Sequence, residues 1–123
     1  MTVSSTPLKT NYHHGDLPQQ AHQLALEILR EHGDTAISLR ALAKQIGVSA
    51  PALYRHFVDR DSLLAELATT GFSALRERLL AVDQSDPRRA LIDIGLVYVS
   101  FARDEPNLYR LMFGGRGLPK GVH

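Results

Sequence analysis

Apolar residues recur at helical spacing along most of this chain. Leu17, Ala21, Leu24 and Ile28 follow one another at steps of four, three and four residues, so they form one stripe along a helix. Gly33 follows this stripe and is typical of a helix C-terminus. No segment alternates apolar and polar residues as a half-buried strand would. The pattern therefore predicts an all-α protein.

Capping residues divide the pattern into six predicted helices. Asp16 and Gln19 have the spacing of a capping box at the start of the first. Gly47 ends the second helix, because the chain there needs a positive φ. The predicted helices begin at Asp16, Ser38, Ser49, Asp59, Asp86 and Pro106.

The third predicted helix is unusually short and carries many hydrogen-bonding groups. Only residues 47–49 join it to the second helix, which forces a sharp angle between the two. A helix of about eight residues, roughly 12 Å long, does not persist alone in water. We expect Leu53 and Phe57 to hold it from beneath, by packing on apolar residues of the first two helices. Residues 38–57 thus predict a helix-turn-helix, whose second helix fits the DNA major groove.

Charge and composition narrow the possible functions. The formal net charge is only +1, but residues 37–60 carry a net +3 and residues 61–105 a net −3. A basic segment followed by an acidic one is typical of a protein that touches a polyanion with one end, although a chance fluctuation is an alternative. The sequence has no cysteine, which excludes disulfides and thiolate metal sites, and no apolar run of membrane-spanning length. We therefore expect a cytoplasmic protein without a cofactor.

The stretch AISLRALAKQIGVSAPALYRHFVDRDSLLAEL resembles the DNA-binding region of the TetR/AcrR family of bacterial transcriptional regulators. The resemblance runs from Asp16 to about Leu75, and LYRHF followed by DRDSLL is its most specific part. YHHGDL and YVSFARDEPNLYRLMFG are similar to a subgroup with a WHG-type C-terminal domain. The resemblance implies a three-helix head with a helix-turn-helix, then a long connecting helix and the start of a helical ligand-binding domain.

This resemblance also implies a division of the chain into three parts. Residues 1–14 would be a flexible tail, residues 15–62 the DNA-binding domain, and residues 63–123 the connecting helix with part of an effector-binding and dimerisation domain. Family members usually continue into two long helices that pair with a twin subunit. We expect this chain to lack those dimerisation helices and to leave part of its fifth helix exposed, at Leu91, Ile92, Leu96 and Val99.

The same resemblance assigns DNA contacts. Arg40 matches a position that contacts a base or a phosphate, residues 49–52 match the helix front over base edges, and Tyr54 and His56 match phosphate-binding positions. Arg60 matches a cation that meets the DNA backbone, and the free amides of a helix N-terminus also attract anions. A solvated surface charge is the alternative for the arginines. The predicted contact residues are Arg40, Ser49, Ala50, Pro51, Ala52, Tyr54, Arg55, His56 and Arg60.

Other candidate sites are weaker. An aromatic cluster across the fifth and sixth helices would either line an effector pocket or pack as core; its residues are Tyr98, Phe101, Tyr109 and Phe113. His13, His14, Asp16 and His22 lack the fixed spacing of a ligand set, so no metal site is predicted. No nucleophile stands with a base in a convincing setting, so catalysis is not expected.

These observations predict a sequence-specific DNA-binding transcriptional regulator, a ligand-responsive repressor that reads a near-palindromic operator with its third helix. Its expected partners are double-stranded DNA and a small-molecule effector of unknown identity, with homodimerisation in a complete family member and no membrane association. The alternative is a truncated helical interaction module that has lost operator binding and associates with related regulators through its last three helices.

Overall fold

The computed structural model describes residues 16–114, which form six α-helices and one 3-10 helix without any β-strand. The all-α prediction is confirmed for this part of the chain. The predicted flexible tail, residues 1–14, lies outside the described residues. The elements are α2 (Leu17–His32), η2 (Asp34–Ala36), α3 (Leu39–Ile46), α4 (Ala50–Tyr54), α5 (Arg60–Leu80), α6 (Pro87–Asp104) and α7 (Pro106–Phe113).

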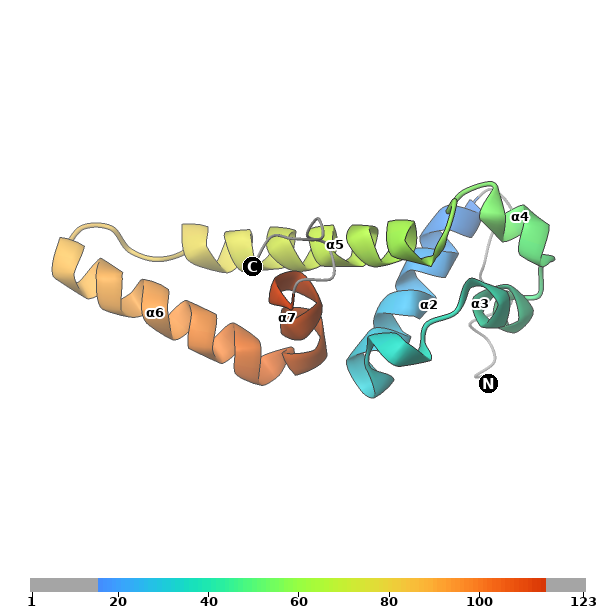
Figure 1. The fold of residues 1–123 in the computed structure, drawn as a ribbon. Helices are drawn as coiled ribbons and strands as arrows, with labels where there is room; N and C mark the ends of the chain where they lie inside the picture. Colours follow the sequence, from blue (N-terminus) through green and yellow to red (C-terminus); the bar gives the residue numbers. More distant parts are fainter. Residues whose placement is uncertain (1–15, 115–123) are drawn as a thin grey trace, which may run out of the picture.

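Helices α2, α3 and α4 pack together as a compact head at one end of α5 (Figure 1). Leu53 is fully buried and Phe57 is 2% exposed beneath α4. Leu42 belongs to the same core, and Ile28 and Ile46 pack against it. The predicted anchoring of the short helix by Leu53 and Phe57 is therefore confirmed.

Most of the predicted helix ends are confirmed. The hydroxyl oxygens of Ser38 and Ser49 accept hydrogen bonds from the amides of Ala41 and Ala52, at 3.0 and 3.2 Å. Gly47 has a φ of 95° at the end of α3, as its position predicted. The cap predicted at Asp16 is wrong, because its side chain makes no capping hydrogen bond. Its φ of −105° and ψ of 25° differ from the extended backbone that directs a cap side chain over the first amides.

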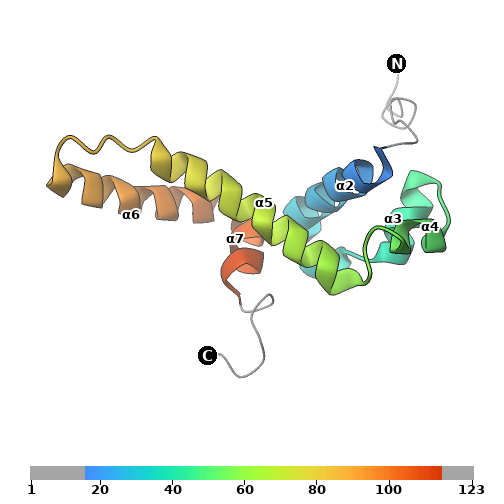
Figure 2. The same ribbon diagram turned by 90° about the horizontal axis from the view of Figure 1, so that it is seen from above.

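The long helix α5 is the axis of the molecule. Helix α6 returns alongside its second half, and the short α7 fills the angle between α5, α6 and the head (Figures 1 and 2). The close packing of α7 on α5 depends on Gly71, where an added Cβ would lie 2.4 Å from Sδ of Met112. No helix within residues 16–114 has the length and hydropathy needed to cross a membrane.

Helix α6 carries a row of apolar side chains that no other described residue covers. Leu91 is 71% exposed and Val99 is 64% exposed, and Ile92 and Leu96 are exposed as well. The predicted exposure of this helix is confirmed. Gly95 lies among these residues, and an added Cβ there would meet no atom within 4 Å.

Candidate nucleic-acid interface

Polar side chains are exposed on α3, at the end of α4 and in the turn that follows α4. Arg40, Tyr54, Arg55 and His56 are all exposed there, and Tyr54 keeps 45% of its surface accessible. Within residues 16–114 none of these four side chains has a hydrogen-bond or ion-pair partner. Four of the predicted contact residues are thus exposed on α3, on α4 and in the turn after α4, with their donors unpaired within the described residues.

Helix α4 is shorter than predicted, with five residues rather than about eight. Its end tightens because the amide of His56 donates to the carbonyl of Leu53, three residues back, at 2.9 Å. Arg55 and His56 therefore lie in a turn and not on the helix. The turn returns Phe57 to the core immediately after two exposed polar residues.

The front of α4 presents small side chains. Pro51 is exposed, whereas Ala50 and Ala52 are partly buried. The hydroxyl oxygen of Ser49 already accepts a hydrogen bond from the amide of Ala52, so this side chain caps α4. Small residues at this end allow close approach to a flat partner, and the hydroxyl proton of Ser49 is the only side-chain donor that residues 49–52 contain.

Arg60, whose DNA contact stays a prediction, forms hydrogen bonds within the protein. It is only partly exposed, and its Nε donates to the carbonyl oxygen of Ile37 at 2.9 Å. One Nη donates to the carbonyl oxygen of Asp34. At the start of α5, where an anion site was expected, the carboxylate of Asp59 accepts a hydrogen bond from the amide of Ser62 at 2.8 Å. That hydrogen bond, together with the one from the Ser62 hydroxyl, lowers the pKa of Asp59, so a negative charge already occupies the helix N-terminus.

Sequence reasoning left Lys44 out of the contact set. Lys44 is exposed in the last turn of α3, four residues after Arg40, so both cations lie on one side of this helix. The helical spacing of the two basic residues could have indicated this pairing. Lys44 and Arg40 thus give α3 two exposed cations on one side.

The aromatic residues predicted for an effector pocket are divided between core and surface. Phe101 is 1% exposed and packs near Tyr109, with ring centroids 6.5 Å apart. The ring of Tyr109 in turn packs against that of Phe113 in a tilted arrangement, with centroids 4.7 Å apart, whereas Tyr98 is exposed. Phe101 is therefore a core residue, which was the alternative to a pocket-lining role. Phe72 was not in the predicted cluster, but its ring meets that of Phe113 edge to face, with centroids 5.3 Å apart.

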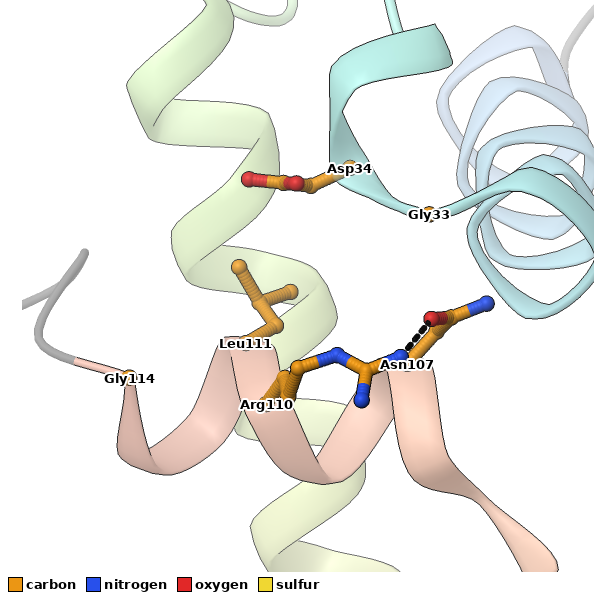
Figure 3. Close-up of a pocket in the computed structure, with 6 residues that line it drawn as sticks. All are labelled: Gly33, Asp34, Asn107, Arg110, Leu111 and Gly114. Atoms are coloured by element: carbon orange, nitrogen blue, oxygen red, sulfur yellow. Dashed lines mark hydrogen bonds between the residues drawn. The ribbon is translucent and has the colours of Figure 1, made fainter.

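A hollow of about 330 Å³ lies elsewhere, between the end of α2 and α7 (Figure 3). None of the four predicted aromatic residues lines it. No local sequence signal could have found it, because it exists only where the head meets α7. Its lining residues are Gly33, Asp34, Asn107, Arg110, Leu111 and Gly114.

Polar contacts join the head to α7 beside this hollow. Nε of Arg30 donates to Oε1 of Glu105 at 3.1 Å, and Nδ2 of Asn107 donates to the carbonyl oxygen of Arg30 at 3.1 Å. Arg110 donates to Oδ1 of Asn107 at 2.7 Å, the dashed contact in Figure 3. The polar groups of Asn107 are thus used within the protein, and they fix the end of α2 against α7.

Comparison with known proteins agrees with this arrangement. Residues 23–67, from α2 into α5, match the family model described as bacterial regulatory proteins, tetR family. Residues 23–67 belong to the TetR family. An uncharacterized HTH-type transcriptional regulator of Bacillus subtilis, YobS, is 33% identical over 86 residues, which are 69% of this chain and 45% of that protein.

Two further proteins are similar to most of this chain. The nucleoid occlusion factor SlmA of Enterobacter sp. is 33% identical over 93 residues, 74% of this chain and 47% of that protein. A solved structure of a protein with unknown function from Rhodococcus sp. RHA1 has a TM-score of 0.71 and 35% identity, covering 91% of this chain and 59% of that one. The chain spans about half the length of the curated relatives it matches.

Proposed function

We propose that this TetR-family chain is a DNA-binding transcriptional regulator that inserts the front of α4 into the major groove. The observation that carries the proposal is the exposure of Arg40, Tyr54, Arg55 and His56 on the helix-turn-helix, where their side chains have no partner among residues 16–114. Buried Leu53 and Phe57 anchor α4 from beneath. A groove about 12 Å wide admits one helix, and α4 is the helix that the head presents.

The proposed contacts divide by chemistry. Tyr54 and His56 hold phosphates, which fixes the orientation of the head on the duplex. Arg40 and Arg55 have the donors needed for base edges or phosphates. The small residues Ala50, Pro51 and Ala52 approach base edges, and apolar contact with thymine methyl groups suits them.

Regulation and assembly belong to the same proposal. Residues 15–62 form the DNA-binding domain, and residues 63–123 form the connecting helix and part of an effector-binding and dimerisation domain. In a dimer, two copies of α4 would meet successive major grooves about 34 Å apart on a near-palindromic operator. A small-molecule effector would release the operator, so the regulator would act as a repressor in the cytoplasm.

The test is a fluorescence-anisotropy titration of the protein onto a duplex selected by it from a random-sequence pool. We expect log K to fall linearly with log salt, because bound phosphates release counterions. Arg55→Gln and Tyr54→Phe should each weaken binding, whereas Arg76→Gln on the exposed side of α5 should not. No selected duplex, or an affinity independent of salt for folded protein, would overturn the proposal.

A second candidate function rests on the exposed apolar row of α6. A helical module of this kind would associate with related regulators through α5, α6 and α7 and would not bind an operator. Leu91→Gln combined with Val99→Gln removes two of its most exposed apolar side chains. Sedimentation of the wild type as a monomer, alone and with a related full-length regulator, would contradict this candidate.

A further inference from the structure

Arg60 joins the two ends of the helix-turn-helix. Its guanidinium donates to the carbonyl oxygens of Ile37 and Asp34, which lie 23 and 26 positions earlier in the chain. Ile37 directly precedes Ser38, the cap of α3, and Arg60 is the first residue of α5. One side chain therefore links the backbone just before α3 to the helix that follows α4.

The two carbonyls belong to a rigid part of the head. The side chain of Ile37 is 2% exposed, so its backbone cannot shift without disturbing the core. The carbonyl oxygen of Asp34 also accepts a hydrogen bond from the amide of Ile37, at 3.1 Å, at the end of η2. A guanidinium can donate to both acceptors at once through its planar fork, whereas an ammonium is a point charge without that geometry.

The surroundings of Arg60 are less favourable to a phosphate than those of Arg40 or Arg55. Exposed Asp59 and Asp61 flank it in sequence, and the Asp59 carboxylate caps α5. Arg60 is partly buried, whereas Arg40 and Arg55 are exposed. Two of the donors of Arg60 already point at protein carbonyls.

We propose that Arg60 is a positioning residue, which sets the placement of α3 and α4 relative to α5 and does not bind DNA phosphate. This inference rests on the proposed DNA-binding function. Specific recognition requires several side chains to meet base edges together, so it is sensitive to small displacements of α4. Non-specific attraction to the phosphates depends mainly on charge and tolerates such displacements.

The experiment compares Arg60→Lys and Arg60→Gln with wild type, at a temperature where all three are folded. Each is titrated onto the selected duplex and onto poly(dI-dC) at several salt concentrations. Arg60→Lys keeps the charge but loses the fork, so we expect binding to the selected duplex to weaken about tenfold and binding to poly(dI-dC) to change by less than about threefold. Arg76→Gln is the matched control, because it removes an exposed positive charge from α5, outside the helix-turn-helix.

The opposite pattern would overturn the inference. If Arg60 bound a phosphate, Arg60→Lys would behave like wild type, and Arg60→Gln would weaken both duplexes alike with a salt slope reduced by about one. A wild type that binds no duplex would contradict the proposed function itself, so the two failures are distinguishable.

A measurement without substitution covers the case in which both Arg60 variants unfold. The Nε–H resonance of Arg60 is followed in ¹⁵N-labelled wild type as the selected duplex is added. We expect this resonance to move less than those of Arg40 and Arg55, because a positioning residue keeps the Ile37 carbonyl as its acceptor when DNA binds. A larger shift for Arg60 than for either of those arginines would overturn the inference.

Discussion

Helices α4 and α6 present opposite kinds of surface. In α4 the apolar Leu53 is fully buried and polar Tyr54 faces outward. In α6 the apolar Leu91 and Val99 face outward, with more than half of each side chain exposed. Helical spacing shows which residues share a side of a helix, but it does not show what covers that side. The exposed cations beside α4, Arg40 on α3 and Arg55 in the following turn, suit a charged partner, whereas the exposed apolar row of α6 indicates only that an apolar partner would be favourable.

The two regions also differ in how their shape is fixed. The head is closed by caps, by the core beneath α4 and by the hydrogen bonds of Arg60. Helix α6 depends on its contacts with α5 and α7, chiefly through buried Ala90 and Phe101. Substitutions of the same kind should therefore have different effects in the two regions.

The largest expected effect is that of Phe57→Ala in the head. This side chain is 2% exposed, so its truncation should lower the free energy of unfolding by about 3 to 5 kcal/mol. The neighbouring Val58→Ala is the matched control, because Val58 is 79% exposed. This substitution should change the free energy of unfolding by less than about 0.5 kcal/mol. Urea denaturation followed by circular dichroism measures both. Equal effects of the two substitutions would contradict the proposed anchoring of α4.

Glycine substitutions should have opposite signs in α5 and α6. Gly71→Ala places a Cβ 2.4 Å from Sδ of buried Met112, so we expect a destabilisation of about 1 to 2 kcal/mol. Gly95→Ala on exposed α6 meets no atom within 4 Å, and the better helix propensity of alanine should stabilise by about 0.5 to 1 kcal/mol. Thermal unfolding of the two variants gives the comparison. A destabilising Gly95→Ala would indicate that another helix already packs closely on α6.

The smallest expected effect is a pH dependence at the start of α5. Hydrogen bonds from the amide and hydroxyl of Ser62 lower the pKa of Asp59 in the folded protein. The contribution of Asp59 is therefore present above its ordinary pKa and is lost as the pH falls through the lowered pKa. Asp59→Asn should flatten the acid side of the stability profile, and Ser62→Ala should give an intermediate result. Denaturation between neutral and acidic pH measures this, and identical profiles for all three proteins would contradict it.

Local features of the fold were predictable from the sequence, and long-range ones were not. Gly47, Ser38 and Ser49 act through residues within four positions, so their roles follow from local spacing. The contacts of Arg60 with Ile37 and Asp34 span more than twenty positions, so local spacing could not reveal them. The hollow beside Gly33 and Asn107 depends on α2 and α7 meeting in space, which no periodicity reveals.

The most direct test of DNA reading by α3 and α4 is an NMR map of backbone amides as the selected duplex is added to ¹⁵N-labelled protein. We predict that the largest shifts fall within residues 38–57, including Arg40, Tyr54 and His56, and that the exposed row of α6 around Leu91 and Val99 stays unchanged. Largest shifts on α6, or shifts spread evenly over both regions, would contradict the account.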